Sequence, residues 1–295
     1  MAFVFLFLAA FLNLTKSYCS KRISGRVDGF SETVDMTMMR NLLCAVIGAL
    51  ILLCMGIDRF SMSPIGWLIC TVSGVAVGLN YIVWVLALKS GVYLLASASN
   101  SASFIVAALC GIVFFEEKLT VTKGAAILLI LLAMLFMGRY QKDADGKKIK
   151  PMHLVYLFFV FLSAGVSSVT QKWFTRTLPE VTPHTFTFYS LLISCVILLV
   201  VTFFIPQKKT VRERSKSIGG LFVWIALMAI CFYGVTYFQT MAAADLDAIV
   251  MYPAYNGTLL AAGSLMAWLC FGEKPNRNSI IGVILVFAAV VLAGL

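Results

Sequence analysis

The sequence predicts an all-α membrane protein in which ten transmembrane helices form two inverted five-helix repeats. Three observations support this fold class. Hydrophobic residues make up 61% of the chain and charged residues only 12%, whereas soluble domains carry about 25% charged residues. The apolar residues are gathered in runs of about 20, which is the length of a helix that crosses a bilayer. Finally, the second half of the chain repeats a pattern of the first.

The apolar runs give ten expected spans in chain order. These are 2–19, 36–56, 65–88, 92–115, 121–139, 152–173, 184–205, 218–240, 247–271 and 278–295. Helices satisfy their own backbone hydrogen bonds in lipid, and alternation typical of barrel strands is absent. Of the seven prolines, only Pro253 lies well inside a span. The first run lacks the positive n-region of a signal peptide, so we expect a retained helix whose Lys16 extends toward the headgroups.

The positive charges predict an orientation rather than a nucleic-acid surface. Loops after the first, third, fifth, seventh and ninth spans hold seventeen Lys and Arg residues, and the loops between them hold five. Cytoplasmic loops carry the excess of such residues. We therefore expect a multi-pass protein of a bacterial plasma membrane with both termini outside. The net charge of +10 then has no soluble basic face with which to bind nucleic acid.

No motif in the chain predicts catalysis, a metal or a cofactor. The eight cysteines lie in or beside apolar runs without metal-ligand spacing. Nucleophile and phosphate-binding motifs are absent. The sequence therefore predicts a protein that is not an enzyme, with no cofactor and no metal. The expected partners are a small-molecule solute and the lipid bilayer, with the protein acting as a monomer or homodimer.

An internal repeat relates the two halves at an offset of 156 residues. The correspondence runs without a gap from residue 78 to 118 and includes residues that are rare inside spans. The matched pairs include Gly78 and Gly234, Tyr81 and Tyr237, Asn100 and Asn256, Glu117 and Glu273, and Lys118 and Lys274. Because each half has five spans, the second enters the membrane inverted. Inverted repeats are typical of secondary transporters, which bind substrate near the midplane between the repeats.

Two segments with a Glu-Lys element and a following glycine-bearing helix, "FFEEKLTVTKGAAILLILLAMLFMG" (114–138) and "CFGEKPNRNSIIGVILVFAAVVLAG" (270–294), resemble the EamA-like transporters of the drug/metabolite transporter superfamily. Arg40 also lies where that family often has an arginine. The resemblance implies repeats at 1–140 and 152–295 joined by a charged loop at 141–151. It also implies movement of a small metabolite across the plasma membrane by alternating access. Two features depart from the family: Arg40 is not duplicated, and the family usually has its termini inside.

The segment "ASASNSAS" (96–103) places polar side chains within an apolar span. Ser97, Asn100 and Ser101 share one helix face. Small residues also allow close helix packing, which is the alternative explanation for the serines. The amide of Asn100 needs partners in hydrocarbon and recurs as Asn256. We therefore expect Ser97, Asn100, Ser101 and Asn256 to line a substrate-binding cavity.

The segment "MYPAYNGT" (251–258) is expected to line the same cavity. Pro253 removes a backbone N–H, and kinked helices at membrane depth are tolerated where they line cavities. We therefore predict a gating kink at Pro253, with Tyr252 and Tyr255 beside it. The alternative is the tyrosine belt found at membrane interfaces.

Four further residues and one cation complete the candidate site. Asn80 and Tyr81 in the third span, and Tyr237 and Gln239 in the eighth, suit a solute with a few hydrogen-bonding groups. Arg40 could contact an anion or could instead extend to the interface. No Asp or Glu is expected in the middle of a span, where a proton-coupled carrier would often have one. A non-transporting scaffold or receptor remains the alternative function, although an inverted repeat gives no advantage to a scaffold.

Overall fold

Helices account for most of the computed structural model, which describes residues 1–26, 29–90, 93–138, 151–204, 219–271 and 277–293. No strand occurs in these ranges. The helices are α1 (Ala2–Ser24), α2 (Gly29–Met55), the short 3₁₀ helix η1 (Ile57–Phe60), α3 (Pro64–Ser90), α4 (Tyr93–Ala102), α5 (Phe104–Phe114), α6 (Val121–Gly138), α7 (Pro151–Thr177), α8 (Pro183–Phe204), α10 (Phe222–Asp245), α11 (Ala248–Phe271) and α12 (Arg277–Ala293).

Proline and glycine mark several helix ends. Helices α3, α7 and α8 each begin with a proline, at Pro64, Pro151 and Pro183. Proline suits the first helical position because its fixed φ is helical and the missing N–H would have no partner there. Helix α2 is followed by Gly56 at φ 116°, a conformation that glycine adopts without strain. These residues explain why the spans end where they do.

Six described helices are long and apolar enough to cross a membrane: Ala2–Ile23, Phe30–Met55, Pro64–Leu88, Met152–Thr177, Pro183–Phe204 and Phe222–Asp245. The other expected spans also coincide with helices, but ten crossings stay a prediction. Helix α2 begins at Gly29, seven residues before the expected start at 36. Glu32 and Asp35 therefore lie in a membrane-length helix, and both are buried. They lie in its first two turns, at the end of the span that runs from Phe30 to Met55.

The expected span at 92–115 is not one helix. It is divided into α4 and α5 at Ser103, whose amide donates to the Asn100 carbonyl oxygen at 3.2 Å. By contrast, α11 runs from Ala248 to Phe271 as a single helix that contains Pro253. The sequence thus predicted a kink at Pro253, in the second half of the chain. In the structure, the helix that is interrupted is the equivalent one in the first half.

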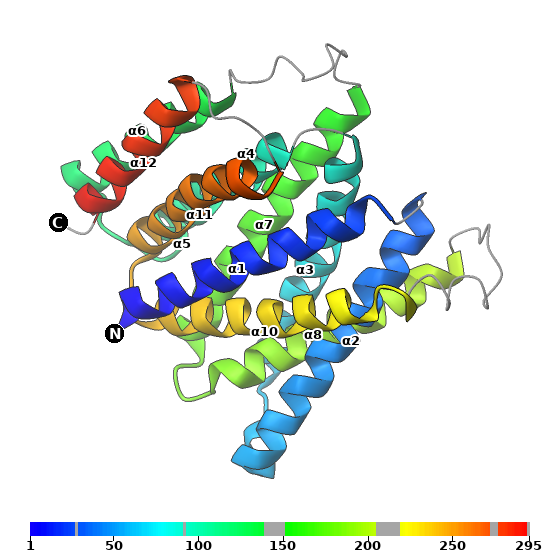
Figure 1. The fold of residues 1–295 in the computed structure, drawn as a ribbon. Coiled ribbons are helices and arrows are strands. Elements are labelled where there is room, and N and C mark those ends of the chain that lie inside the picture. Colours follow the sequence, from blue (N-terminus) through cyan, green and yellow to red (C-terminus); the bar gives the residue numbers. More distant parts are fainter. Residues whose placement is uncertain (27–28, 91–92, 139–150, 205–218, 272–276, 294–295) are drawn as a thin grey trace.

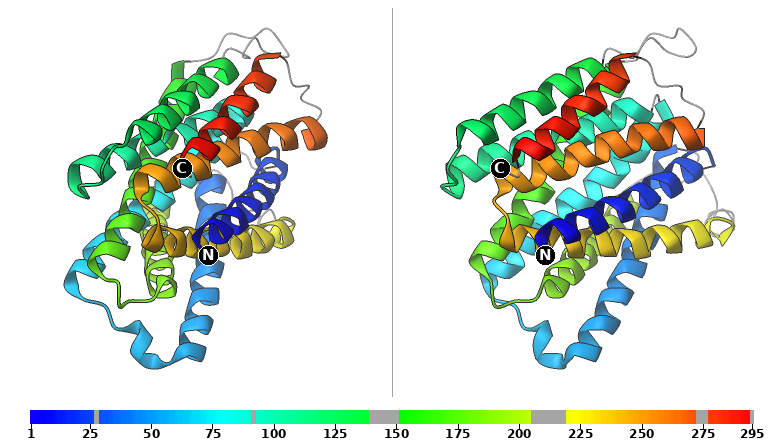
Figure 2. Two further views of the ribbon diagram at one scale, coloured as in Figure 1. Left: turned by 90° about the vertical axis from the view of Figure 1, so that its left-hand side faces the viewer. Right: turned by 60° about the vertical axis from the view of Figure 1, so that its left-hand side comes forward.

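The helices pack in pairs that the 156-residue offset relates. Helix α1 packs along α10, and the equivalent pair α3 and α7 packs in the same way. Helix α2 packs on its own counterpart α8, and α6 packs on its counterpart α12 (Figures 1 and 2). Helix α1 begins and α12 ends on the same side of the bundle (Figure 1). This arrangement brings residues from both halves to the centre.

Small residues bring α3 and α8 into close contact. A Cβ atom on Gly74 would lie 2.8 Å from the Ser190 carbonyl oxygen, and one on Gly78 would lie 2.7 Å from Ser194 Oγ. In lipid, helix association depends on such close packing, because lipid is as apolar as the side chains. A side chain on Gly74 would press on the backbone of α8, whereas one on Gly78 would displace the Ser194 hydroxyl.

Candidate functional site

A polar cavity of about 100 Å³ lies between the two halves of the chain. Helices α1, α2, α3, α4, α7, α10 and α11 contribute side chains to it, and Ser103 lies at the α4–α5 break. The lining residues are Asn13, Leu14, Lys16, Ser17, Arg40, Val77, Asn80, Tyr81, Trp84, Asn100, Ser101, Ser103, Ala164, Ser167, Ser168, Gln171, Phe232, Val235, Gln239, Tyr255, Asn256 and Leu259. This lining contains amides, hydroxyls, aromatic rings and two cations, but no Asp or Glu.

Most of the candidate site residues lie together on this cavity. Those that line it are Arg40, Asn80, Tyr81, Asn100, Ser101, Gln239, Tyr255 and Asn256. The repeat-related pair of Asn100 and Asn256 therefore contributes one amide from each half. These residues come from five different helices, so only the packing of the bundle brings them together.

Three candidates are placed differently. Tyr252 does not line the cavity; it is fully buried and donates its hydroxyl to the Ser168 carbonyl oxygen at 2.6 Å. Tyr237 also lies outside the lining and stacks on the His184 ring, with centroids 3.9 Å apart. Both aromatic rings are held by helix packing. Ser97 lies in α4, and its side chain is outside the described part of the structure.

Hydrogen bonds fix several of the cavity amides. Asn80 Nδ2 donates to the Val160 carbonyl oxygen at 3.2 Å and to Ser163 Oγ at 3.1 Å, which joins α3 to α7. Asn256 Nδ2 donates to the Tyr252 carbonyl oxygen at 3.0 Å, one turn earlier in α11. Asn80 uses both N–H groups of its amide, so its oxygen is left for a solute, whereas Asn256 keeps one N–H and its oxygen. Fixed amide orientation lowers the entropy lost on binding.

Asn13 is a functional candidate that the sequence did not single out. Its Nδ2 donates to the Tyr255 hydroxyl at 2.6 Å, which joins α1 to α11 across the halves. The other unpredicted lining residues with polar side chains are Lys16, Ser17, Ser103, Ser167, Ser168 and Gln171. Most of them follow the i, i+3, i+4 spacing that marks one helix face, and this spacing in α1 and α7 was the available signal.

Arg40 is the largest fully buried side chain among the described residues, with an exposed fraction of 0%. Its Nε and Nη2 atoms both donate to Asn41 Oδ1, at 3.0 and 2.7 Å, and Asn41 in turn donates to Ser194 Oγ at 2.8 Å. The guanidinium carbon lies 3.8 Å from the centroid of the Tyr81 ring and 4.1 Å from that of Phe232. Such cation–π contacts stabilise a desolvated cation. Arg40 therefore does not extend to the membrane interface.

Lys16 also points inward, contrary to the expectation that it reaches the headgroups. It lines the cavity, and its Nζ atom lies 5.1 Å from the centroid of the same Phe232 ring. The reason is the length of α1, which continues to Ser24 instead of ending at 19. Lys16 therefore lies well inside the helix rather than close to its end, and its side chain reaches the polar cavity.

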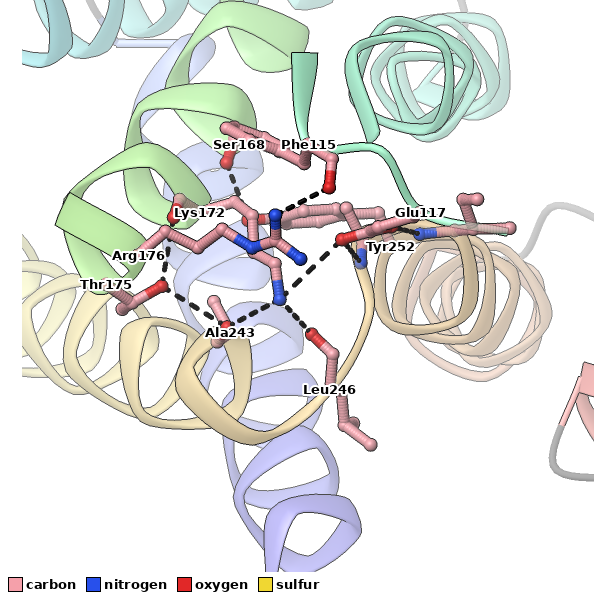
Figure 3. Close-up of polar contacts among 11 residues, drawn as sticks. Phe115, Glu117, Ser168, Lys172, Thr175, Arg176, Ala243, Leu246 and Tyr252 are labelled. Atoms are coloured by element: carbon pink, nitrogen blue, oxygen red, sulfur yellow. Dashed lines mark hydrogen bonds and ion pairs between the residues drawn. The ribbon is translucent and has the colours of Figure 1, made fainter. Parts of the chain in front are cut away.

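A second polar site, shown in Figure 3, lies beside the cavity and joins the two halves. The Glu117 carboxylate accepts hydrogen bonds from the backbone amides of Ala248 at 2.9 Å and Ile249 at 3.0 Å. These are the first two residues of α11, whose amides have no partner within the helix. A carboxylate at a helix N-terminus is also favoured by the helix dipole. Glu117 thus caps a helix of the second half from the first half.

Basic residues of α7 complete this site (Figure 3). Lys172 Nζ lies 3.7 Å from Glu117 Oε1 and donates to the carbonyl oxygens of Ala243 at 3.1 Å and Leu246 at 2.5 Å. Arg176 Nη1 donates to the Phe115 carbonyl oxygen at 2.5 Å. We call Glu117, Lys172 and Arg176 the interhelix clamp. On α7, Lys172 directly follows Gln171, the last residue of that helix that lines the cavity, and Arg176 lies one turn further along.

The described residues offer no arrangement for metal-dependent chemistry. Within the ranges that the structure describes, no group of three or more His, Cys, Asp or Glu side chains could hold a metal ion. The side chains that line the cavity offer hydrogen-bond donors, acceptors and two cations, which are groups that can bind a solute.

Comparison with known proteins identifies the family. A solved structure titled "Crystal structure of protein" has a TM-score of 0.75 and 14% sequence identity, and the match covers 99% of this chain and 96% of the other. This similarity shows the fold alone. No curated protein matches significantly. The sequence model of the EamA-like transporter family matches residues 1–139 and 152–295, which is nearly the whole chain. The chain is therefore a multi-pass helical membrane protein that belongs to the EamA-like transporter family.

Proposed function

We propose that this protein moves a small solute across the plasma membrane by alternating access, with the central cavity as the solute site. The main support is the position of the cavity: amides, hydroxyls and two cations from both halves meet inside an apolar bundle. A polar cavity at this depth destabilises a protein unless it is hydrated or occupied. A transporter requires such a site, and membership of the family makes solute transport the expected activity.

The repeat suggests how access alternates. The equivalent pairs α1–α10 and α3–α7 each join one helix of the first half to one of the second. In an inverted repeat the two halves can exchange conformations, so that the opening moves from one side to the other. We take residues 1–140 and 152–295 as these halves, with 141–151 as the connection. The expected motion is rocking of one set of helices against the other around the cavity.

The interhelix clamp is our candidate for the closed side. Glu117 lies in the α5–α6 connection and Leu246 in the α10–α11 connection, and Lys172 contacts both. Any opening between these connections must separate Glu117 from the α11 N-terminus. The clamp therefore stabilises the closed arrangement at this end, and release of its contacts would accompany opening.

A scaffold or receptor is the alternative function, and burial of the polar side chains argues against it. Ser101 and Asn256 line the cavity yet are 2% and 4% exposed. A scaffold would present its recognition groups on an accessible surface. The proposal also assigns no catalytic activity to the chain.

Proteoliposome flux tests the proposal directly. The purified protein is first screened for metabolites that raise its thermal midpoint, and those metabolites are then tested for flux. Ser101→Trp should fill the cavity and abolish flux without preventing folding. Leu109→Trp, at a 57% exposed position on α5, is the matched control and should retain flux. Equal flux through both variants, or no flux of any stabilising solute, would exclude the cavity as the transport site.

A further inference from the structure

The cavity carries two cations and no carboxylate, which bears on the chemical class of its solute. Arg40 and Lys16 both contact the Phe232 ring, at 4.1 and 5.1 Å from its centroid. Glu32 and Asp35 lie earlier on α2 and are not part of the lining. Among the described residues, neither Arg40 nor Lys16 forms an ion pair. The two positive charges therefore have no carboxylate beside them among the residues that line the cavity.

One nitrogen of the Arg40 guanidinium makes no hydrogen bond among the described residues. Nε and Nη2 are used by Asn41, whereas Nη1 has no hydrogen-bond partner among the described residues although it is buried. Burying an N–H of a charged group without a hydrogen-bond partner lowers the stability of the protein. The cation–π contacts with Tyr81 and Phe232 offset part of this cost. An anionic hydrogen-bond acceptor on the solute would give Nη1 a partner and would balance the positive charge.

We infer that the solute is a small organic monoanion with a carboxylate group, bound between Arg40 Nη1 and Lys16 Nζ. Asn41 Oδ1 occupies the edge of the guanidinium formed by Nε and Nη2, which leaves the edge formed by Nη1 and the second N–H of Nη2 for a solute. Two parallel N–H groups on this edge match the two oxygens of a carboxylate. Lys16 adds a second positive charge on the same cavity. This inference rests on the proposed function and specifies its substrate class.

The remaining lining predicts what the rest of the solute carries. The amides of Asn100, Gln239 and Asn256 and the hydroxyl of Ser101 surround the cavity on the α4, α10 and α11 sides. They can donate to or accept from hydroxyl, amide or carbonyl groups. With about 100 Å³ of space, the closed cavity suits a short-chain acid with one or two further polar groups better than a nucleotide or a large drug.

Matched acids and amides provide the test. Lactate, glycerate, glycolate and 3-hydroxybutyrate are each compared with the corresponding amide (lactamide, glyceramide, glycolamide, 3-hydroxybutyramide) at equal concentration, with thermal shift and titration calorimetry on the purified protein. At least one acid should bind, and its amide should bind at least tenfold more weakly, the factor expected for loss of a hydrogen bond to a charged group. Choline and glucose serve as cationic and neutral probes.

Variants distinguish a direct role of the two cations in binding from a general loss of folding. Arg40→Gln and Lys16→Gln should each weaken binding of the acid at least tenfold, whereas Arg277→Gln, at an exposed position on α12, should leave it unchanged. If Arg40→Gln fails to fold, Lys16→Gln alone decides, because Lys16 makes no hydrogen bond within the described structure.

The outcomes separate failure of this inference from failure of the proposed function. Binding and flux of choline, glucose or an amide with no response to any acid would overturn the anion inference but support transport. Binding of an acid that both variants retain at full affinity would also overturn it. If no probe of any charge binds and none is moved in proteoliposomes, both the inference and the proposed function are contradicted.

Discussion

Glu117 Oε1 and Lys172 Nζ lie 3.7 Å apart between the two halves of the chain, and both side chains are at most 5% exposed. The same carboxylate caps α11 through Ala248 and Ile249. One side chain thus holds together the α5–α6 connection, α7 and the start of α11. This geometry makes the pair a testable element of both stability and gating.

Replacement of Glu117 by Gln should lower stability by about 3 kcal/mol, the lower end of the cost of breaking a buried pair. The lower end applies because Lys172 keeps the carbonyl oxygens of Ala243 and Leu246 as acceptors. Lys172→Met in the same chain should recover part of the loss, since no unpaired charge remains. Thermal unfolding in detergent measures both effects. The exposed neighbour Glu116 supplies the control Glu116→Gln, and equal effects of the two Gln variants would show that the pair adds nothing.

Replacement of Asn100 or Asn256 by Leu should weaken solute binding by about 1–3 kcal/mol, because a polar group of the solute loses its partner. Leucine is close to asparagine in size, so packing changes little. Stability should fall only by about 0.6 kcal/mol, the typical value of a hydrogen bond between membrane helices. Calorimetry and the thermal midpoint are measured on the same samples. A lowered midpoint with unchanged affinity in both variants would make the two asparagines packing residues.

Pro253→Ala should leave the protein folded and slow transport. The structure shows that α11 is continuous across Pro253, so alanine fits the helix and adds an amide that can bond to the Ile249 carbonyl oxygen. If the weakened turn assists opening, its repair reduces the initial rate of flux. Flux is compared at equal amounts of reconstituted protein. An unchanged rate would show that Pro253 is only a tolerated bend.

The charge distribution predicts that the α7–α8 connection faces outward. A single cysteine at exposed Glu180, introduced after removal of the eight native cysteines, should react with an impermeant thiol reagent in intact cells. A cysteine at Lys148, which lies outside the described residues, should resist it. The reverse pattern of labelling would place the termini inside, as is usual in the family.

The sequence by itself determined that this is a helical membrane protein built from two repeats. Its apolar runs predict helices, and described helices lie at each expected position, because hydrocarbon leaves a lone segment no other way to satisfy its backbone. The offset of 156 residues identified Asn100 and Asn256 as equivalents, and both line the cavity. Patterns of this kind are local or repeated, so they can be read along the chain.

Only the tertiary structure decided which side chains share the cavity. Tyr252 and Tyr255 are three residues apart, yet Tyr255 lines the cavity and Tyr252 packs on Ser168. Lys16 turns inward because α1 extends to Ser24 and Phe232 of α10 lies beside it. Helix periodicity shows which face of a helix a residue lies on, but it does not show which other helix packs against that face. That neighbour depends on how helices distant in sequence pack, which the sequence pattern of one helix does not contain.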